Sequence, residues 1–404
     1  MALMPVAEAL ARVLEHAVPL AAESAPLAKA HGRVLADGLE ALRTQPPAAV
    51  SAMDGYAVRA ADVASAPARL RLIGEVAAGH PFDGTVGAGE AARIFTGGVL
   101  PQGADTIVIQ ENTSREGETV VIEVPSGAGR HIRAAGLDFA TGAALLPAGR
   151  RLTERDLALA AAMNHPAVPV HRRPRVAVLA TGDELVMPGS DAGIGQIVYS
   201  NGYATMALIR REGCEVIDLG IVRDRLDDTI AAVRRAGELG ADILVTSGGA
   251  SVGDHDLVQT ALAAEGMALS FWKVAMRPGR PMMHGRLGAM HVLGLPGNPV
   301  SAYVCSLLFL LPLMRRLAGR TDLEQPAEQA LLGCDLPGND ERADYLRSSL
   351  TPGHDDGLPV ATPFAVQDSS MLAPLAQAAC LLLREPHAPA AKAGSRCAII
   401  KLGL

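Results

Sequence analysis

The sequence contains few aromatic residues and no excess of positive charge. Aromatic side chains make up 3% of its 404 residues, and the formal net charge is −7 at pH 7. Proteins that bind single-stranded nucleic acid stack the bases on aromatic side chains, and proteins that bind DNA or anionic lipid present basic surfaces. The composition therefore argues against a nucleic acid or a membrane surface as partner. An anionic ligand would need a local cationic pocket.

The sequence also lacks a long uninterrupted apolar run and any close pair of cysteines. Its longest apolar stretch, Val300 to Met314, spans about 15 residues, fewer than the roughly 20 that a membrane span needs, so it predicts a buried helix. The apolar N-terminal segment is interrupted by Glu8 and Arg12, unlike a signal peptide. Five cysteines without a CxxC pair fit reduced thiols rather than a zinc finger or a disulfide scaffold. We therefore expect a cytoplasmic protein.

What is present is ample apolar material, arranged in patterns that change along the chain. Apolar residues make up 49% of the sequence, and the length predicts about two to four domains. Val6, Leu10 and Val13 recur at helical spacing, which predicts an N-terminal helix. From about residue 27 to 173, short β-like runs are broken by glycine and proline. From Arg175 to Leu317, apolar strands alternate with helices, which predicts a doubly wound α/β domain, and short strands return after about residue 325.

Three loops of the α/β segment follow predicted strands, which is where open α/β sheets bind ligands. TGDEL, from Thr181, places acids at a strand end, although a turn with an acidic helix cap explains it at least as well. TSGGASVGDHD, from Thr246 to Asp256, is rich in glycine and small hydroxyls, so its backbone N–H groups could approach an anion; a simple glycine-rich turn is the alternative. GLPGNPVSA leads a strand into a helix with Asn298 at the N-cap and Pro299 at the first helical position, an end that favours anions.

A cationic segment, FWKVAMRPGRP, lies between the second and third of these loops. If it forms a strand, Lys273 and Arg277 project to the same side and could grip a phosphate or an oxyanion. A solvated, charged strand face is the alternative.

Carboxylates in or near these loops suit a hard cation such as Mg²⁺, which prefers oxygen ligands and bridges to substrate phosphate. The candidate metal ligands are Asp54, Glu184, Asp224 and Asp256. Spacing alone does not single out any of them, and the Asp-Gly pair that contains Asp54 also fits an ordinary turn.

Eight motifs in fixed order connect these features to a known family. They are MDGYAV, IFTGGVLPQGAD, GRHIRAAGLDFATG, TGDEL, SNGYA, SGGASVGDHD, FWKVAMRPGRP and GLPGNPVSA. Together they closely resemble the molybdopterin molybdenumtransferase (MoeA) family, whose animal relative is the C-terminal domain of gephyrin. The resemblance spans nearly the whole chain and is weakest after about Leu323.

The resemblance implies an α/β plus β multidomain fold. A three-layer, doubly wound α/β molybdopterin-binding domain is expected beside β-rich N-terminal domains and a C-terminal β-barrel-like domain. The implied boundaries are 1–22 for an N-terminal helix that docks on the α/β domain, 23–45 with 136–173 for a linker and dimerisation domain, 46–135 for the β-rich domain with MDGYAV, 174–323 for the α/β domain and 324–404 for the C-terminal β domain.

The resemblance further implies a cytosolic homodimer with an active site shared between subunits. Such an enzyme takes molybdate and adenylylated molybdopterin, hydrolyses the adenylate with Mg²⁺, and releases AMP and molybdenum cofactor. Molybdopterin adenylyltransferase and apo-molybdoenzymes are possible partners, whereas no nucleic acid and no membrane are expected.

Carried over position by position, the family's functional residues form two groups. The catalytic group is Asp54, Thr96, Glu184, Asp224, Asp256, Lys273 and Arg277. The substrate-binding group is Asp138, Thr181, Ser247, Gly248, Gly249, Ser251, Gly253, Arg280, Pro296, Gly297, Asn298 and Pro299. The family commonly has lysine where Arg277 and Arg280 stand. At these two positions a planar guanidinium, which can make two parallel hydrogen bonds, therefore replaces a compact ammonium group.

Two other functions compete with this interpretation. Molybdopterin adenylyltransferase shares the α/β domain, but it would leave the roughly 170 residues before Arg175 unexplained. A gephyrin-like scaffold would anchor a partner peptide, but the retention of Asp54, Glu184, Asp256 and Lys273 argues against a purely structural descendant.

Overall fold

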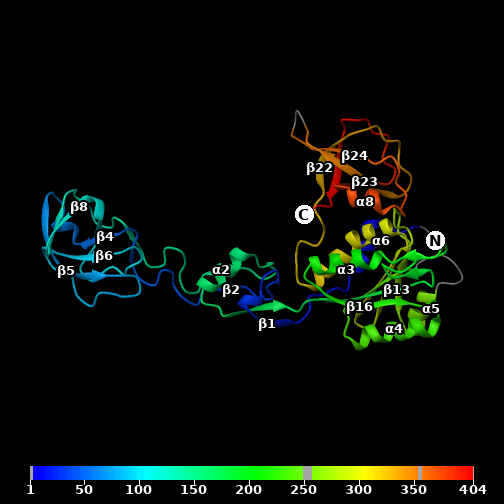
Figure 1. Ribbon diagram of the computed structural model, residues 1–404, viewed down its shortest axis with the longest axis horizontal. Helices are drawn as coiled ribbons and strands as arrows, with labels where there is room; N and C mark the ends of the chain where they lie inside the picture. The colour runs from blue at the N-terminus through cyan, green and yellow to red at the C-terminus, as the bar shows by residue number, and fades with distance from the viewer. Residues whose placement is uncertain (1–2, 249–256, 354–356, 404) are drawn as a thin grey trace. The chain divides into compact units, whose positions relative to one another are not determined.

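The structure, a computed structural model, describes residues 3–248, 257–353 and 357–403 (Figure 1). The described chain divides into two compact units. One contains residues 3–23, Gly32–Ala36 and the described residues from Val170 onward, and the other contains Ser24–His31 and Asp37–Pro169. Strands β1 (Ala22–Pro26) and β12 (Ala167–His171) pair with each other at the points where the chain leaves and re-enters the first unit.

The unit with Asp37–Pro169 is built around a six-stranded sheet in the order β7-β4-β6-β5-β9-β8. Its strands are β4 (Gly55–Val58), β5 (Ala68–Val76), β6 (Glu90–Ile94), β7 (Thr106–Ile109), β8 (Thr113–Glu116) and β9 (Thr119–Ile122). Successive residues of β4 enter different apolar clusters, Tyr56 and Val58 one and Ala57 the other, so both faces of the sheet are covered.

Shorter elements complete this unit. Two small antiparallel pairs join β2 (Leu39–Glu40) to β11 (Ala144–Leu146) and β3 (Val50–Ser51) to β10 (Ile132–Arg133), and the 3-10 turns are η1 (Leu27–Lys29), η2 (Ala60–Asp62) and η3 (Gln110–Asn112). Helix α2 (Glu154–Ala162) begins at a reciprocal capping box between Thr153 and Asp156, which satisfies backbone N–H groups at the helix start.

The other unit contains a second six-stranded sheet, in the order β16-β13-β17-β21-β20-β18. Its strands are β13 (Arg175–Thr181), β16 (Glu215–Val222), β17 (Ile243–Ser247), β18 (Ala268–Trp272), β20 (Met283–Leu287) and β21 (Met290–Leu295). The first four strands in this order are parallel, and β20 runs antiparallel to both of its neighbours. A short parallel pair, β14 (Leu185–Val186) with β15 (Ile197–Val198), follows β13 in sequence.

Helices cover both faces of this sheet. One face carries α1 (Val6–Leu14), α3 (Asn201–Arg211), α6 (Pro299–Cys305) and α7 (Leu311–Leu317), and the other carries α4 (Leu226–Glu238) and α5 (Leu257–Ala264). Along β13, Val176 and Val178 face the first layer, whereas Ala177 and Leu179 face the second. Every side chain of this strand after Arg175 is therefore buried, which explains its continuous apolar sequence.

The long helical run at the end of the α/β domain lies in the core. Helices α6 and α7 are joined by a π-helical turn, Ser306–Leu310, so the helix predicted from about Pro299 to Leu317 is present but irregular. Pro312, which has no backbone N–H to donate, stands at the start of α7. Within the described residues this 19-residue helical run, with mean hydropathy 1.5, is the one stretch long and apolar enough to cross a membrane, yet 78% of it is buried inside the protein.

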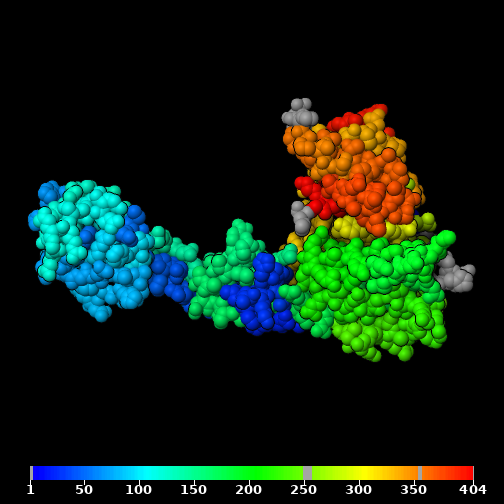
Figure 2. All heavy atoms as spheres, in the orientation of Figure 1, coloured from blue at the N-terminus to red at the C-terminus, as the bar shows by residue number. Residues whose placement is uncertain are grey.

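The C-terminal strands close into a small barrel that packs beside the α/β domain (orange to red in Figure 2). Its strands are β22 (Glu328–Leu332), β23 (Ala343–Thr351), β24 (Val360–Pro363), β25 (Cys380–Arg384) and β26 (Arg396–Lys401), with helix α8 (Leu372–Gln377) between β24 and β25. Pairing of β23 with both β24 and β25 closes the ring. Strand β19 (Met276–Arg277), from the cationic segment, also pairs with β23. The multidomain fold expected from the sequence is thus confirmed.

Two buried histidines lie in the core of the α/β domain. His284 on β20 and His291 on β21 are 2% and 3% exposed, and their rings stack with centroids 5.8 Å apart. Both nitrogens of His284 and the Nδ1 of His291 make no hydrogen bond within the described structure. Burial, reinforced by the charges of neighbouring Arg286 and His16, lowers the pKa of His284 to about 3 and that of His291 to about 4.

These two histidines predict a loss of stability in mild acid. Below an unfolded-state pKa of about 6.5 the unfolded chain binds protons that the folded chain does not, so stability falls as the pH drops from about 6.5 towards 4. We expect a cost on the order of 2 kcal/mol per histidine at pH 5. Urea unfolding at pH 7.5 and pH 5 measures it. His291→Gln should lose part of the pH dependence and His31→Gln, at an exposed position, should keep it; equal pH dependence in both variants would contradict the prediction.

Candidate active site

The candidate site lies at the carboxyl edge of the parallel strands. Registers along the sheet place Thr181 beside Val222 and, on neighbouring strands, Ala180 beside Ser247 and Ser247 beside Leu295. The loops that follow β16, β13, β17 and β21 therefore begin at the same edge. The TGDEL, TSGGASVGDHD and GLPGNPVSA loops all start there because parallel strands all point the same way.

Acidic side chains gather where the loops after β13 and β16 meet. The backbone N–H of Asp183 donates to Asp224 (3.4 Å to Oδ2), and the N–H of Asp224 donates back to Asp183 (3.2 Å to Oδ1). Glu184 is exposed beside this pair. The structure thus brings the predicted Glu184 and Asp224 to adjacent loops and adds Asp183, which the sequence analysis had not included in the site.

The glycine-rich loop is described as far as Gly248. This residue has φ of +96°, and a Cβ atom there would lie 2.8 Å from the carbonyl oxygen of Thr181, so only glycine fits. The described start of the loop therefore packs directly against the TGDEL strand end, where Thr181 and Ser247 are both buried. Four predicted site residues, Gly249, Ser251, Gly253 and Asp256, lie outside the described residues.

The cationic segment is not one continuous strand, which corrects the expected geometry of Lys273 and Arg277. Strand β18 ends at Trp272, and Lys273 has φ of +81°, a rare conformation for a residue with a side chain. Its backbone is held from two sides, since its N–H donates to Met282 O (2.9 Å) and its C=O accepts from Met4 N (3.4 Å). The Lys273 ammonium lies 5.1 Å from the centre of the Trp272 ring.

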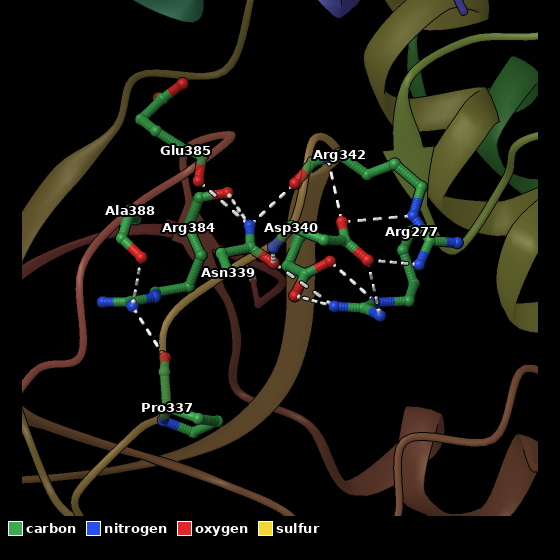
Figure 3. A network of polar contacts seen from close by, with 9 residues as sticks. Arg277, Pro337, Asn339, Asp340, Arg342, Arg384, Glu385 and Ala388 are labelled. Atoms are coloured by element: carbon green, nitrogen blue, oxygen red, sulfur yellow. Dashed lines mark hydrogen bonds and ion pairs between the residues drawn. The ribbon is translucent and has the colours of Figure 1, made fainter.

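Arg277 contacts the C-terminal barrel (Figure 3). Its guanidinium binds the carboxylate of Asp344 through two hydrogen bonds of 2.8 and 2.6 Å, and lies 3.5 Å from Asp340, which also pairs with Arg342. The hydrogen bonds to Asp344 raise the pKa of Arg277. Arg280 is exposed and has no ion-pair partner in the described part of the chain. Lys273 and Arg280 are therefore the cations of this segment that remain open to an anionic ligand.

The GLPGNPVSA motif begins α6 with Asn298 at the N-cap and Pro299 first in the helix. The Asn298 side chain does not cap the helix; it donates to Ser369 Oγ of the barrel (2.8 Å), and Val300 N donates to Ser369 O (3.1 Å). Part of the predicted anion-binding helix end is thus occupied by the protein itself. Pro296 is buried and Gly297 is exposed next to it.

Three predicted residues belong to the other unit. One oxygen of Asp54 accepts hydrogen bonds from the backbone N–H and the hydroxyl of Thr96, both at 2.7 Å. The backbone hydrogen bond is the largest of the causes that lower the pKa of Asp54, followed by the Thr96 hydroxyl and the charge of Arg93. Asp138 is exposed, and its backbone N–H donates to Gln45 O (3.0 Å).

Two of the predicted acids lie on adjacent loops, as binding of Mg²⁺ together with a phosphate ligand would require. No group of three or more His, Cys, Asp or Glu side chains close enough to bind a metal occurs among the described residues. Mg²⁺ is commonly bound through one or two carboxylates together with substrate phosphates and water. Glu184 and Asp224 are the two predicted acids on adjacent loops of this edge, while Asp54 belongs to the other unit and Asp256 is outside the described residues.

Asn201, at the start of α3, is a further residue that the sequence analysis had not included. Its side-chain nitrogen donates both to Ser247 Oγ (3.1 Å) and to Gly297 O (2.7 Å). The only feature of the sequence that pointed to Asn201 is its place in the SNGYA motif, at the first position of the helix.

Family models match three consecutive regions of the chain. Residues 4–164 match the MoeA N-terminal region (domain I and II), residues 177–316 a probable molybdopterin binding domain, and residues 329–402 the MoeA C-terminal region (domain IV). The class is therefore a MoeA-type multidomain protein, with a molybdopterin-binding type of α/β domain between two other regions.

Individual relatives agree with this class. Over 332 residues, or 80% of this chain and 75% of the relative, the sequence is 40% identical to molybdopterin molybdenumtransferase of Nostoc sp.. It is 33% identical to that of Bacillus subtilis over 93% of this chain and 88% of the relative. A crystal structure of a molybdopterin biosynthesis MoeA protein from Pyrococcus horikoshii superposes with a TM-score of 0.85, 29% identity and 100% coverage of both chains. The chain belongs to the molybdopterin molybdenumtransferase family.

The ion pair of Arg277 predicts that Asp344 stabilises the junction between the barrel and the α/β domain. Asp344→Ala leaves a half-exposed guanidinium without its two charged hydrogen bonds, so we expect a loss of about 2 kcal/mol. Asp335→Ala is the matched control, because the Asp335–Lys392 pair of the same barrel is largely exposed. Denaturant unfolding measures both variants, and equal effects would refute a special role for Asp344.

Proposed function

We propose that the protein inserts molybdenum from molybdate into adenylylated molybdopterin and hydrolyses the adenylate with the help of Mg²⁺. Membership of a family of enzymes named for this transfer supports the proposal, and the names of the relatives do not favour a scaffold or an adenylyltransferase. The observation that supports this function best is that the loops after β13, β17 and β21 begin at one sheet edge. The acids Glu184 and Asp224 lie in loops at that edge, and the cations Lys273 and Arg280 lie in the segment after β18.

Neutral donors, cations and acids at the sheet edge have different proposed roles. Ser247, Gly248 and the Gly297–Asn298 turn before α6 offer N–H and hydroxyl donors to phosphate oxygens, and Lys273 and Arg280 offer positive charge. Glu184 and Asp224 would hold Mg²⁺ against the phosphates, where the cation neutralises charge that develops during hydrolysis. Water adds across the phosphoanhydride bond and AMP leaves. The two dithiolene sulfurs of molybdopterin then replace oxygen on molybdate, and the displaced oxygen leaves as water with the thiol protons.

We further propose that the protein works as a homodimer whose active site is shared between subunits. Support comes from the segment from Met187 to Tyr203, which contains β15 and the start of α3, where apolar side chains are exposed. They are Met187, Ile194, Ile197, Val198 and Tyr203. A second copy of the chain is the proposed occupant of this surface. Exposed apolar side chains next to a site mark an interaction surface. In addition, the predicted site residues are divided between the two units.

Location and partners follow from the same proposal. The five cysteines are all unpaired, as suits the reducing cytoplasm. A molybdopterin adenylyltransferase would supply the adenylate, and apo-molybdoenzymes would receive the product.

Removing either of two acids is expected to stop turnover without unfolding the protein. Asp54→Ala and Glu184→Ala should each lower AMP release at least about 100-fold, because each removes a carboxylate that acts on the reacting phosphates. AMP release from adenylylated molybdopterin, with and without molybdate and Mg²⁺, followed by reconstitution of an apo-molybdoenzyme, measures this. Asp83→Ala, an exposed acid of the same unit as Asp54, is the control. Near-normal AMP release from both acid variants would contradict the proposed chemistry.

A shared site predicts complementation between two inactive variants. Asp54→Ala and Lys273→Ala subunits, mixed into heterodimers, should recover about one active site in two, since one composite site then holds both native residues. The heterodimers are isolated with two different affinity tags before the assay. Verified heterodimers without activity would show that each subunit holds its whole site.

A further inference from the structure

The side-chain amide of Asn201 connects two of the candidate substrate loops. Both of its N–H groups are engaged, one by Ser247 Oγ at 3.1 Å and the other by Gly297 O at 2.7 Å. Ser247 ends β17, and Gly297 follows β21, the next strand of the sheet. Ladder hydrogen bonds between these strands reach only as far as Ser247 and Leu295, so beyond that point the loops depend on side chains for their spacing.

Asn201 itself is held firmly. It is the first residue of α3, whose Thr205, Met206 and Ile209 are buried against the sheet. Gly202 allows the ring of Tyr199 to come close, since a Cβ on Gly202 would lie 1.6 Å from the Tyr199 hydroxyl oxygen. The helix start therefore has little freedom to shift, and the amide presents a fixed pair of donors.

The Gly297–Pro299 turn is also held from the opposite side, by the C-terminal barrel. Ser369 accepts from the Asn298 side chain at 2.8 Å and, through its carbonyl, from Val300 N at 3.1 Å. The loop that carries Ser369 is fixed by Arg347, which is 1% exposed and donates to Asp368 O (2.9 Å) and Met371 O (3.0 Å). Hydrogen bonds thus link the barrel to the turn and, through Asn201, the turn to Ser247.

We propose that Asn201 is a positioning residue that sets the separation between the Ser247–Gly248 loop and the Gly297–Pro299 turn, with Ser369 supporting the turn from the barrel. This inference rests on the proposed function, because these loops hold the substrate phosphates only if that function is right. A shift of about 1 Å in groups that orient a reacting phosphate can lower the rate about 100-fold, so a small link of this kind has a large effect on turnover.

Asn201→Ala tests the proposal in the full-length protein. We expect kcat for AMP release to fall about 10- to 100-fold while KM changes much less and the melting temperature stays near that of the wild type. Ser369→Ala should lower kcat in the same way, by a smaller factor. Asn112→Ala is the matched control, because its side chain makes no hydrogen bond within the described part of the protein.

Asn201→Asp adds a signature that a merely structural role would not produce. A carboxylate cannot donate to Gly297 O and repels it, whereas a protonated carboxyl group regains one donor. The ratio of the variant's kcat to that of the wild type should therefore rise as the pH is lowered from 8 towards 5.5.

A second measurement does not depend on activity. Hydrogen–deuterium exchange of segments 243–248 and 294–300 should become faster in Asn201→Ala and stay unchanged in Asn112→Ala. Unchanged exchange, unchanged kcat in an active protein, a rise in KM alone, or a loss of activity that merely follows a large fall in melting temperature would each overturn the positioning role. A wild type that releases no AMP, but whose exchange responds to Asn201→Ala as expected, would refute the proposed function and leave the link between the loops standing.

Discussion

The parallel pairing of β13, β17 and β21 is the constraint on which the rest of the structure depends. Their side chains are buried on both faces, between α1, α3, α6 and α7 on one side and α4 and α5 on the other. Because the three strands run in the same direction and in register, their loops begin at a single edge. The close approach of Gly248 to Thr181 and the two hydrogen bonds of Asn201 depend on this arrangement, because they join loops whose starting positions the strands set.

The cationic segment shows how distant parts of the chain cooperate at that edge. Met4, close to the N-terminus, binds the backbone on both sides of Val274, and β23 of the barrel pairs with Met276 and Arg277. Lys273 is left in a left-handed conformation, and Arg277 is turned to Asp344. Two cations that look equivalent in the sequence thus have different surroundings: Lys273 lies beside the Trp272 ring, whereas Arg277 is bound to the barrel.

Much of the fold could be predicted because burial imposes local patterns. The apolar run of β13 and the strand and helix alternation after it led to the prediction of the α/β domain, and both were found.

The residues of the site were harder to predict than the fold. Glu184 was chosen from the TGDEL motif and Asp224 from the family resemblance, but Asp183 and Asn201 were not assigned to the site, because a single Asp or Asn next to a helix or turn usually serves that turn. The strand expected for the cationic segment was wrong, since its pairing partners come from both ends of the chain.

The sequence by itself determined the family, the order of β-rich and α/β segments along the chain and the residue types of the candidate loops. These depend only on composition and on motifs read along the chain. Only the tertiary structure decided which of those residues meet. Asn298 was expected to cap α6 and instead binds Ser369, which is 71 residues away, and Asn201 reaches Gly297 across 96 residues. The physical reason is that a side chain's hydrogen-bond partner is chosen by the groups that packing brings within about 3 Å, and packing joins segments without regard to their separation in sequence.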